Sequence, residues 1–367
     1  MNDHTQAASL LNTKQHYEIL DGLRGVAAIA VVIFHFMEIA IPDYNDNFIA
    51  HAYLAVDFFF CLSGFVIAYA YDKKLANIGF AKFFKQRLIR LQPLVIICSI
   101  WGLIAFIVDP FSNLWVKYAD KLGIAFAASC LMIPYPLVPE RYFNIFHLNP
   151  PSWSLFWEYV ASIVYAVVLI RVGKKALWAL VAVGAMALVY EAHHATNLGV
   201  GWSGDNFWGG GIRVFFSFLA GILVYRSGYI IRNKLGFLIT SGLLLLTLVV
   251  PFSTTYNWII EPTIVIVCFP LLIAIGAGAA PGPRAQRLCE LSGNISYPLY
   301  MIHYPFIWIF MSYVETHKPT LLLMSIITVV GTLLLIGLSY LVLVFMDMPV
   351  RMFLKNKLAG SSSTVSG

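Results

Sequence analysis

Two ionisable side chains, Arg24 and His35, stand 11 residues apart in the otherwise apolar stretch 22–36. At about 100° per residue, this spacing returns them to within roughly 20° of each other on a helix, so they share one face. At about 1.5 Å per residue they are separated by about 16 Å, around half the hydrocarbon thickness of a bilayer. If Arg24 lies at a membrane surface, His35 lies near mid-depth, where an ionisable group is costly and usually functional. A neutral histidine there could act as a general base; the alternative is a structural histidine, with Arg24 snorkelling to the surface.

Three carboxylates lie in or near the apolar runs and could orient His35. Glu38, three residues beyond the histidine, could bond it, but an external interfacial position is the favoured interpretation. Asp57 lies about one turn into the next run, and Glu158 lies about one turn into a later run, four residues after Ser154. We expect Asp57 or Glu158 to orient His35, as the third group of a catalytic triad does. A structural ion pair is the alternative for Asp57.

A pair of arginines closes the most basic loop of the chain. Arg87 and Arg90 lie in the segment RLIR at i and i+3, which places them on one face of a helix. Guanidinium groups bind phosphate oxygens bidentately, so the pair is suited to a phosphate ligand. The alternative is a topology signal that contacts anionic headgroups, which is sufficient for the neighbouring lysines.

A second histidine, His303, lies in an apolar run with Tyr300 three residues before it. We assign His303, Tyr300 and Ser154 to substrate binding, and a structural histidine is the alternative for His303. Trp153 and Trp157 flank Ser154 and suit either the stacking of sugar rings or an aromatic belt at the membrane interface. The sequence alone does not separate these two interpretations.

The composition places these residues in a membrane. Hydrophobic residues make up 60% of the 367-residue chain and charged residues 11%, against about 25% charged residues in soluble domains. We expect an all-α, polytopic integral membrane protein. The net charge of +6 orients loops and does not indicate nucleic-acid binding. The five cysteines show no CxxC spacing, so neither a metal site nor a disulfide framework is expected.

Ten apolar runs are long enough, or nearly so, to cross a bilayer as helices. They lie at 22–41, 53–71, 91–109, 153–170, 176–191, 211–225, 235–250, 258–278, 294–312 and 320–346. An eleventh run, 122–134, is short, and if it crossed, the later basic clusters would fall outside the cell. With 122–134 interfacial or re-entrant, 18 of the 24 Lys and Arg residues lie in cytoplasmic segments and both termini are cytoplasmic.

The predicted organisation has three parts. A cytoplasmic lead-in occupies 1–19, the membrane domain 20–352, and a disordered cytoplasmic tail 353–367. No apolar h-region precedes the first span, so we expect no cleaved signal peptide and expect that span itself to direct membrane insertion.

Five motifs in this order resemble the acyltransferase type 3 family of membrane O-acyltransferases. They are LDGLRGVAAIAVVIFHF at 20–36, DFFFCLSGF at 57–65, RLIR at 87–90, SWSLFWE at 152–158 and ISYPLYMIH at 295–303. Each motif alone is weak, but their order on ten spans is specific, and the resemblance extends from Leu20 to Arg351. It implies transfer of an acyl group, in particular acetyl, from cytoplasmic acyl-CoA to a hydroxyl of a carbohydrate or glycolipid such as O-antigen or exopolysaccharide.

The resemblance also implies roles for individual residues. In that family the residues matching Arg24 and His35 are essential, as is the arginine pair matching Arg87 and Arg90, to which we assign the phosphates of acyl-CoA. It further implies a bacterial inner membrane, contacts with membrane lipids, and acyl-CoA as a substrate with no permanently bound cofactor. Some members carry an esterase-like domain after the last span, and this sequence shows none, so a stand-alone form is expected.

The competing hypothesis is a proton-coupled transporter or exporter. Intramembrane His, Asp and Glu side chains are also what proton relays use. However, the sequence shows no inverted repeat with paired broken helices, which many transporters have. A transporter would also have no need of a phosphate site at RLIR, so the acyltransferase hypothesis is favoured.

Overall fold

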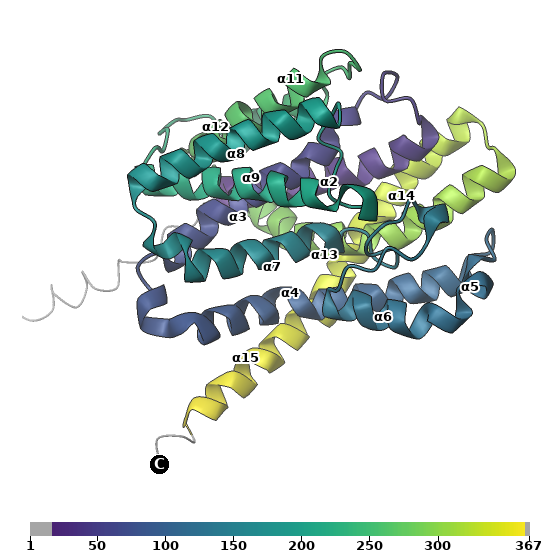
Figure 1. Ribbon diagram of the computed structural model, residues 1–367, viewed down its shortest axis with the longest axis horizontal. Helices are drawn as coiled ribbons and strands as arrows, with labels where there is room; N and C mark the ends of the chain where they lie inside the picture. Colours follow the sequence, from purple (N-terminus) through teal and green to yellow (C-terminus); the bar gives the residue numbers. More distant parts are fainter. Residues whose placement is uncertain (1–16, 364–367) are drawn as a thin grey trace, which may run out of the picture.

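The computed structural model describes residues 17–363, and this part of the chain consists of helices and loops without a β-strand (Figure 1). One isolated antiparallel bridge joins two loop segments at Asn144 and Ser203. The predicted all-α class is therefore confirmed. The long helices run alongside one another in a bundle, and α15 projects from it at the C-terminal end (Figure 1).

The helical elements follow one another with short connections, apart from the loop-rich segment between α4 and α7. In chain order they are α2 (Glu18–Ala40), η1 (Ala50–Leu54), α3 (Ala55–Tyr71), α4 (Leu75–Val108), α5 (Leu114–Lys117), η2 (Ala119–Lys121), α6 (Leu122–Leu131), η3 (Pro139–Arg141), α7 (Ser152–Val167), η4 (Leu169–Arg171), α8 (Lys174–His194), η5 (Gly204–Asn206), α9 (Phe207–Ser227), α10 (Phe237–Leu248), α11 (Asn257–Thr263), η6 (Ile264–Cys268), α12 (Phe269–Gly278), α13 (Pro283–His317), α14 (Leu321–Val342), η7 (Leu343–Asp347) and α15 (Met348–Ser363). Both η6 and η7 are π-helical.

Within the described residues, seven helical segments are long and apolar enough to cross a bilayer. They are Glu18–Ala40, Ala50–Tyr71, Leu75–Val108, Lys174–His194, Gly204–Ser227, Asn257–Gly278 and Leu321–Lys357. Several apolar helices of this length make the chain an integral membrane protein. The other three predicted spans correspond to the helices α7, α10 and α13, which do not meet the same standard of length and apolarity. The count of ten spans and the orientation of the termini therefore stay predictions.

The short run at 122–134 forms α6, a helix of ten residues that packs against α4. Gln92 of α4 donates from its side-chain amide to the carbonyl of Cys130 over 2.6 Å, and the hydroxyls of Ser99 and Ser129 lie 2.8 Å apart. At about 1.5 Å per residue, α6 is about 15 Å long, half the thickness of the hydrocarbon layer. Its length fits a segment that does not cross the bilayer.

The two ends of the chain differ from the predicted boundaries. Residues 1–16 of the expected lead-in lie outside the described residues, and α2 already begins at Glu18. The tail expected to be disordered from 353 is helical as far as Ser363, because α15 continues there from the end of η7. The structure thus has a helix over 353–363, where disorder was predicted, and 364–367 lie outside the described residues.

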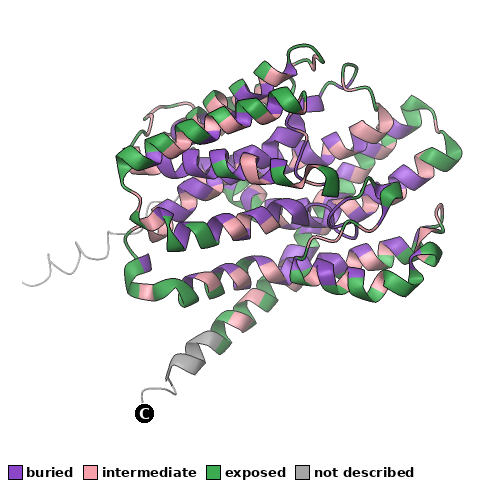
Figure 2. Ribbon diagram, viewed as in Figure 1, coloured by how far each residue is buried: buried purple, intermediate pink, exposed green. Residues whose placement is uncertain are grey.

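The surface of the bundle carries many apolar side chains, as expected of helices that face lipid. On α14 the exposed residues include Leu322, Val329, Leu333 and Leu334. Figure 2 shows the buried positions gathered on the inner sides of the helices and the exposed ones along the outer faces of α8 and α14. An apolar exterior around a partly polar interior is the pattern of a membrane bundle with an internal site.

Helix α2 packs against α13 at a close distance that only small residues allow. A Cβ atom added at Gly25 would lie 2.4 Å from the Cβ of Ser292, so a larger residue would push the two helices apart. The same device joins α3 to α9, where a Cβ at Gly64 would lie 2.1 Å from the carbonyl oxygen of Phe218. These two contacts hold α2, α3, α9 and α13 together around the polar groups described next.

Candidate active site

The bundle encloses two neighbouring cavities, one at each end of the Arg24–His35 stretch of α2. The arginine cavity has a volume of about 220 Å³, and its polar lining includes Arg24, Ser63, Arg87, Arg90, Ser154, Glu158, Ser296, Tyr300, Asp347 and Arg351. The histidine cavity has a volume of about 610 Å³, and its lining includes His35, Glu38, Tyr44, Tyr142, Asn144, Trp153, Asn197, Trp202, Arg213, Tyr300, Tyr304, Trp308 and Glu315. The sequence placed Arg24 and His35 on one helix face at different depths, and the structure gives each its own cavity.

Arg24 is fixed on the α13 side of the arginine cavity. Its Nε donates to the hydroxyl of Ser296 over 2.8 Å, and its Nη2 donates to the carbonyl of Gly293 over 2.7 Å. The same Nη2 lies 3.2 Å from a carboxylate oxygen of Asp21, one turn earlier in α2. Because α2 and α13 approach so closely at Gly25, the guanidinium can reach the backbone of α13. Arg24 is thus held in a set orientation with its charge only partly compensated.

Arg87 and Arg90 both line the arginine cavity, as their i, i+3 spacing predicted. Arg87 is 5% exposed and forms an ion pair with Glu158, which also accepts a hydrogen bond of 2.9 Å from Ser63. Arg90 is exposed and makes no hydrogen bond to the part of the chain that the structure describes, while its charged neighbours include Arg24 and Arg87. The pair therefore combines one anchored and one free guanidinium facing the same space.

A fourth guanidinium in this cavity was not among the predicted site residues. Arg351 at the start of α15 pairs with Asp347 at the end of η7, and both side chains line the arginine cavity. The two residues lie four apart, a spacing that alone indicates a pair within one helix and not a cavity. The π-helical turn η7 precedes it, and such turns are frequent at functional sites.

His35 is oriented by Glu38 in the histidine cavity. Its Nδ1 lies 2.6 Å from Oε1 of Glu38, and the other oxygen of that carboxylate accepts a hydrogen bond of 3.2 Å from the Tyr44 hydroxyl. A carboxylate only accepts hydrogen bonds, so Nδ1 donates to it, and in the neutral imidazole Nε2 is then the nitrogen that can accept a proton. The bond between Glu38 and His35 that the spacing offered is therefore confirmed, and the interfacial position of Glu38 stays a prediction.

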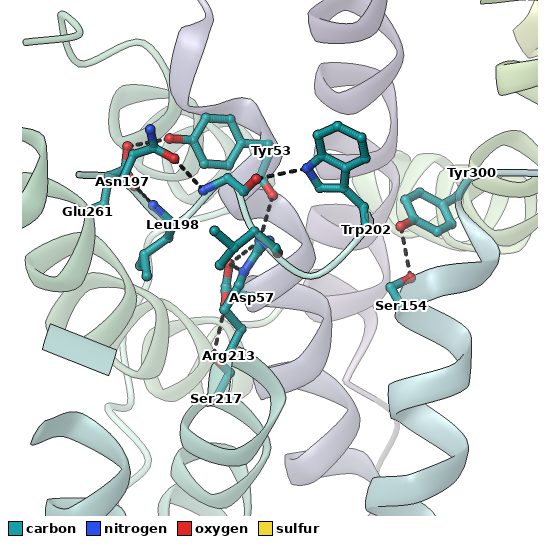
Figure 3. A network of polar contacts seen from close by, with 12 residues as sticks. Tyr53, Asp57, Ser154, Asn197, Leu198, Trp202, Arg213, Ser217, Glu261 and Tyr300 are labelled. Carbon is teal, nitrogen blue, oxygen red and sulfur yellow. Dashed lines mark hydrogen bonds and ion pairs between the residues drawn. The ribbon is translucent and has the colours of Figure 1, made fainter. Parts of the chain in front are cut away.

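The two carboxylates expected to orient His35 have other partners. Glu158 lies in the arginine cavity with Arg87, and Asp57 forms a buried ion pair with Arg213, whose Nη2 lies 2.6 Å from the carboxylate. Asp57 is 0% exposed and also accepts from Ser217 over 3.4 Å (Figure 3). The prediction that Asp57 or Glu158 orients His35 is therefore wrong. The contacts of Asp57 match the structural alternative that the sequence left open.

Arg213 also ties a loop onto the bundle. Its guanidinium donates to the carbonyl of Val200 over 2.8 Å and to that of Tyr53 over 3.2 Å (Figure 3). Two residues earlier in the loop, the amide of Leu198 donates to Glu261, which also accepts from the hydroxyl of Tyr53. Sequence reasoning did not single out Glu261, although a carboxylate inside an apolar run was a usable signal.

His303 lies behind His35 and lines neither cavity. The two imidazole rings stack with centroids 5.2 Å apart at 23°, and Nδ1 of His303 lies 2.8 Å from the carbonyl of Tyr300. A carbonyl only accepts, so Nδ1 donates, and the buried Nε2 has no partner among the described residues. The structure therefore places His303 as a support of His35. Of the residues assigned to substrate binding, Tyr300 and Ser154 do line a cavity.

Aromatic side chains give the histidine cavity its character. Trp153, Trp202, Trp308, Tyr142 and Tyr304 line it beside the polar groups of Glu38, Asn144, Asn197 and Glu315. The ring of Tyr304 lies 4.7 Å from that of His35 in an edge-on contact. Flat aromatic faces next to hydrogen-bonding side chains suit a ligand with alternating apolar faces and hydroxyls.

Comparisons with known proteins relate this chain to acyltransferases. The sequence model of an acyltransferase domain family matches residues 17–344. Protein 2 in picA locus of Rhizobium radiobacter is 35% identical over 188 residues, which are 48% of this chain and 95% of that protein. O-acetyltransferase OatA of Staphylococcus aureus is 25% identical over 90% of this chain, which spans only 57% of the length of OatA. No solved structure matches the chain.

Proposed function

Because this chain belongs to the acyltransferase domain family and is an enzyme that transfers acyl groups, we propose that it moves an acyl group from acyl-CoA to a hydroxyl of a carbohydrate or glycolipid. The observation that carries this proposal is the pair of adjoining cavities, one rich in guanidiniums and one holding an oriented histidine. No observation on the described residues favours the proton-coupled transporter over this assignment.

The donor belongs in the arginine cavity. Arg24, Arg87, Arg90 and Arg351 surround it, against the two carboxylates of Glu158 and Asp347. The phosphates of coenzyme A are the part of an acyl-CoA that such a set of forked donors would bind. The acetyl ester is the donor that the O-acetyltransferase name of OatA favours.

The acceptor belongs in the histidine cavity. An acceptor hydroxyl placed at Nε2 of His35 loses its proton to that nitrogen as its oxygen attacks the thioester carbonyl. The new C–O bond forms, the C–S bond breaks, and the proton passes from His35 to the departing sulfur of coenzyme A. Glu38 stabilises the imidazolium that exists between these two proton transfers. The aromatic lining would stack against sugar rings of the acceptor, for which O-antigen and exopolysaccharide are candidates.

The proposed orientation places the arginine cavity at the cytoplasmic face of a bacterial inner membrane. Arg24 near the start of α2 and Arg351 at the start of α15 line the same cavity, which supports both ends lying on one side. The basic loop before Arg87 is at this end too, and basic loops stay in the cytoplasm.

Chemical labelling tests this orientation. In intact spheroplasts, a membrane-impermeant thiol reagent should label Asn113→Cys and leave Asn77→Cys unlabelled, with the partly exposed Cys130 and Cys268 replaced by Ser. Both chosen positions are exposed, so access depends on the side of the membrane and not on burial. The reverse pattern would refute the proposed topology.

Mass spectrometry of envelope glycans tests the reaction. Cells that express the chain should carry glycan-bound acyl esters that are missing from cells without it and from cells with His35→Ala. The matched control is His193→Ala, because that histidine is exposed and lines neither cavity. Identical glycans in all four strains would contradict the proposed function.

A further inference from the structure

The two cavities share two lining residues. Val56 of α3 and Tyr300 of α13 are the residues that line both of them among the described residues. Ser154 of α7 and Phe59 of α3 line the arginine cavity at this junction. We call these four residues, Val56, Phe59, Ser154 and Tyr300, the junction.

One hydrogen bond joins two of the junction residues. The hydroxyls of Tyr300 and Ser154 lie 2.9 Å apart (Figure 3), and the Ser154 hydroxyl also lies 3.0 Å from the carbonyl of Pro151. A carbonyl only accepts, so Ser154 donates to Pro151 and accepts the proton of Tyr300. The side chains of Tyr300 and Ser154 are therefore linked where the two cavities share lining residues.

The ring of Tyr300 is held between two other rings. Phe59 packs edge-on against it with centroids 5.7 Å apart, and the ring of His303 lies 6.0 Å away. Tyr300 is 7% exposed and Val56 is 6% exposed, so both side chains are largely packed against protein. A group that reaches from one cavity to the other passes these two side chains, because both line both cavities.

The reacting carbonyl has to lie at this junction. The coenzyme A phosphates belong with the arginines and the acceptor hydroxyl with His35, so the thioester must sit between them. The rest of the acyl chain must then occupy space already packed by Val56, Phe59 and Tyr300. A methyl group needs little room there, whereas each additional methylene meets a filled wall.

We propose that the junction is the acyl-length selector of this enzyme and admits short acyl groups, of which acetyl fits best. This inference rests on the proposed function, because it assumes an acyl-CoA in the arginine cavity. The hydroxyl of Ser154 and the ring of Tyr300 set the width of the passage, and Val56 sets its opposite wall. The substrate class is thus a short-chain acyl-CoA.

Inside-out membrane vesicles from cells expressing the full chain offer the test. Labelled acetyl-, butyryl- or octanoyl-CoA is added to the exposed cytoplasmic face, and label transferred to envelope glycan is measured. Wild type should prefer acetyl- over butyryl-CoA by at least about tenfold, since one methylene in a tight pocket discriminates by about 10–200-fold. Tyr300→Ala should reduce this preference by about tenfold or more and give measurable octanoyl transfer.

Three further variants show whether a change in acyl preference comes from the size of the Tyr300 ring, from its hydrogen bond or from a general loss of folding. Tyr300→Phe keeps the ring and should retain the acetyl preference, while Val56→Ala widens the passage from α3 and should lower it even if Tyr300→Ala does not fold. Tyr313→Ala is the matched control, since it removes the same side chain from the same helix outside both cavities. Its preference should equal that of wild type.

The possible results separate the acyl-length selector from the proposed acyltransferase function. Equal transfer of all three acyl groups by wild type, or an unchanged preference in both Tyr300→Ala and Val56→Ala, overturns the selector while leaving the acyltransferase intact. Transfer from none of the three donors, with wild-type protein present in the vesicles, overturns the proposed function and the selector together.

Discussion

The arginine cavity and the histidine cavity differ in how their polar groups are held. In the arginine cavity, Arg90 has no hydrogen bond to the described residues, and Arg87 is only partly satisfied because its buried Nε has no partner there. In the histidine cavity, His35 is bonded to Glu38 and stacked on His303, and the wall is tied down by Arg213.

This difference matches two kinds of ligand. Free or half-paired guanidiniums keep hydrogen-bonding capacity for an anion that arrives and leaves in every cycle. A histidine that must take a proton in the transition state works best when its orientation is already fixed. The predictions below test whether the first cavity serves binding and the second serves chemistry.

The largest effect is expected at His35. Removal of a general base lowers a rate by about 10²–10⁴-fold, so His35→Ala should abolish detectable acyl transfer while membrane insertion is unchanged. Glu38→Gln should transfer acyl groups more slowly than wild type but still measurably. Its amide can still bond Nδ1 but cannot stabilise the imidazolium. Label transfer in the vesicle assay gives both rates, and near wild-type transfer by His35→Ala would remove the histidine from the mechanism.

The next largest effect is a loss of thermal stability when Asp57 is replaced. Removing one partner of a buried ion pair costs about 3–5 kcal/mol, since the Arg213 charge stays buried, so Asp57→Ala should unfold at a clearly lower temperature in detergent. The double variant Asp57→Leu with Arg213→Met should recover most of this loss, because no unpaired charge remains. An inactive Asp57→Ala protein with unchanged thermal stability would instead return Asp57 to the catalytic residues.

A smaller effect is expected at the arginines. A charge-assisted hydrogen bond contributes about 1.5–3 kcal/mol, so Arg90→Lys or Arg351→Lys should raise the KM for acyl-CoA by about ten- to a hundredfold. The KM for the acceptor should change little, because the substitutions lie in the other cavity. Arg171→Lys, on an exposed turn, serves as the control. Equal donor affinities in wild type and Arg90→Lys would favour the lipid-headgroup alternative.

The smallest effect is a pH dependence at His147, which lies outside the candidate spans. Burial, and secondly the charge of Arg141, lower the pKa of His147 to about 3. The unfolded chain takes up this proton near pH 6.5 and the folded chain does not, so the stability falls as the pH drops from 6.5 towards 3. The slope is about 1.4 kcal/mol per pH unit.

Thermal unfolding at pH 7.5 and pH 5 measures this contribution. The wild type should lose more stability between these pH values than His147→Gln, and the difference isolates the histidine. Arg141, which is sandwiched between the rings of Phe106 and Trp308, stays in place in both proteins. If wild type and His147→Gln lost the same stability between pH 7.5 and pH 5, His147 would be protonated in the folded state as readily as in the unfolded one.

The sequence predicted what depends on local spacing. The helix period predicted that Arg24 and His35 share one face of a helix, and that Arg87 and Arg90 do so too. Residues on one helix face are set by residue number alone. The same rule offered the contact of Glu38 with His35, although a carboxylate near a helix end also fits the membrane interface. The family and the all-α class followed from motif order and apolar runs.

What the sequence did not predict depends on packing between distant segments. Asp57 finds its partner 156 residues away and Glu158 finds Arg87 across 71 residues, and no periodicity encodes such pairs. The pairing of Arg351 with Asp347 is local, but the place of Arg351 in the arginine cavity depends on how α15 packs against α4. The junction at Tyr300 could not be foreseen, because it exists only where α3, α7 and α13 meet.

One continuous helix, α2, carries both Arg24 and His35, so the helix fixes the distance and the angle between these two side chains. Insertion of a single residue between them would turn His35 by about 100° away from its cavity, whereas an insertion of about one full turn would keep the facing and lengthen the gap by about 5.4 Å. In the proposed mechanism, the distance from the phosphate-binding arginine to the histidine that activates the acceptor is therefore set by the number of residues between them in one helix.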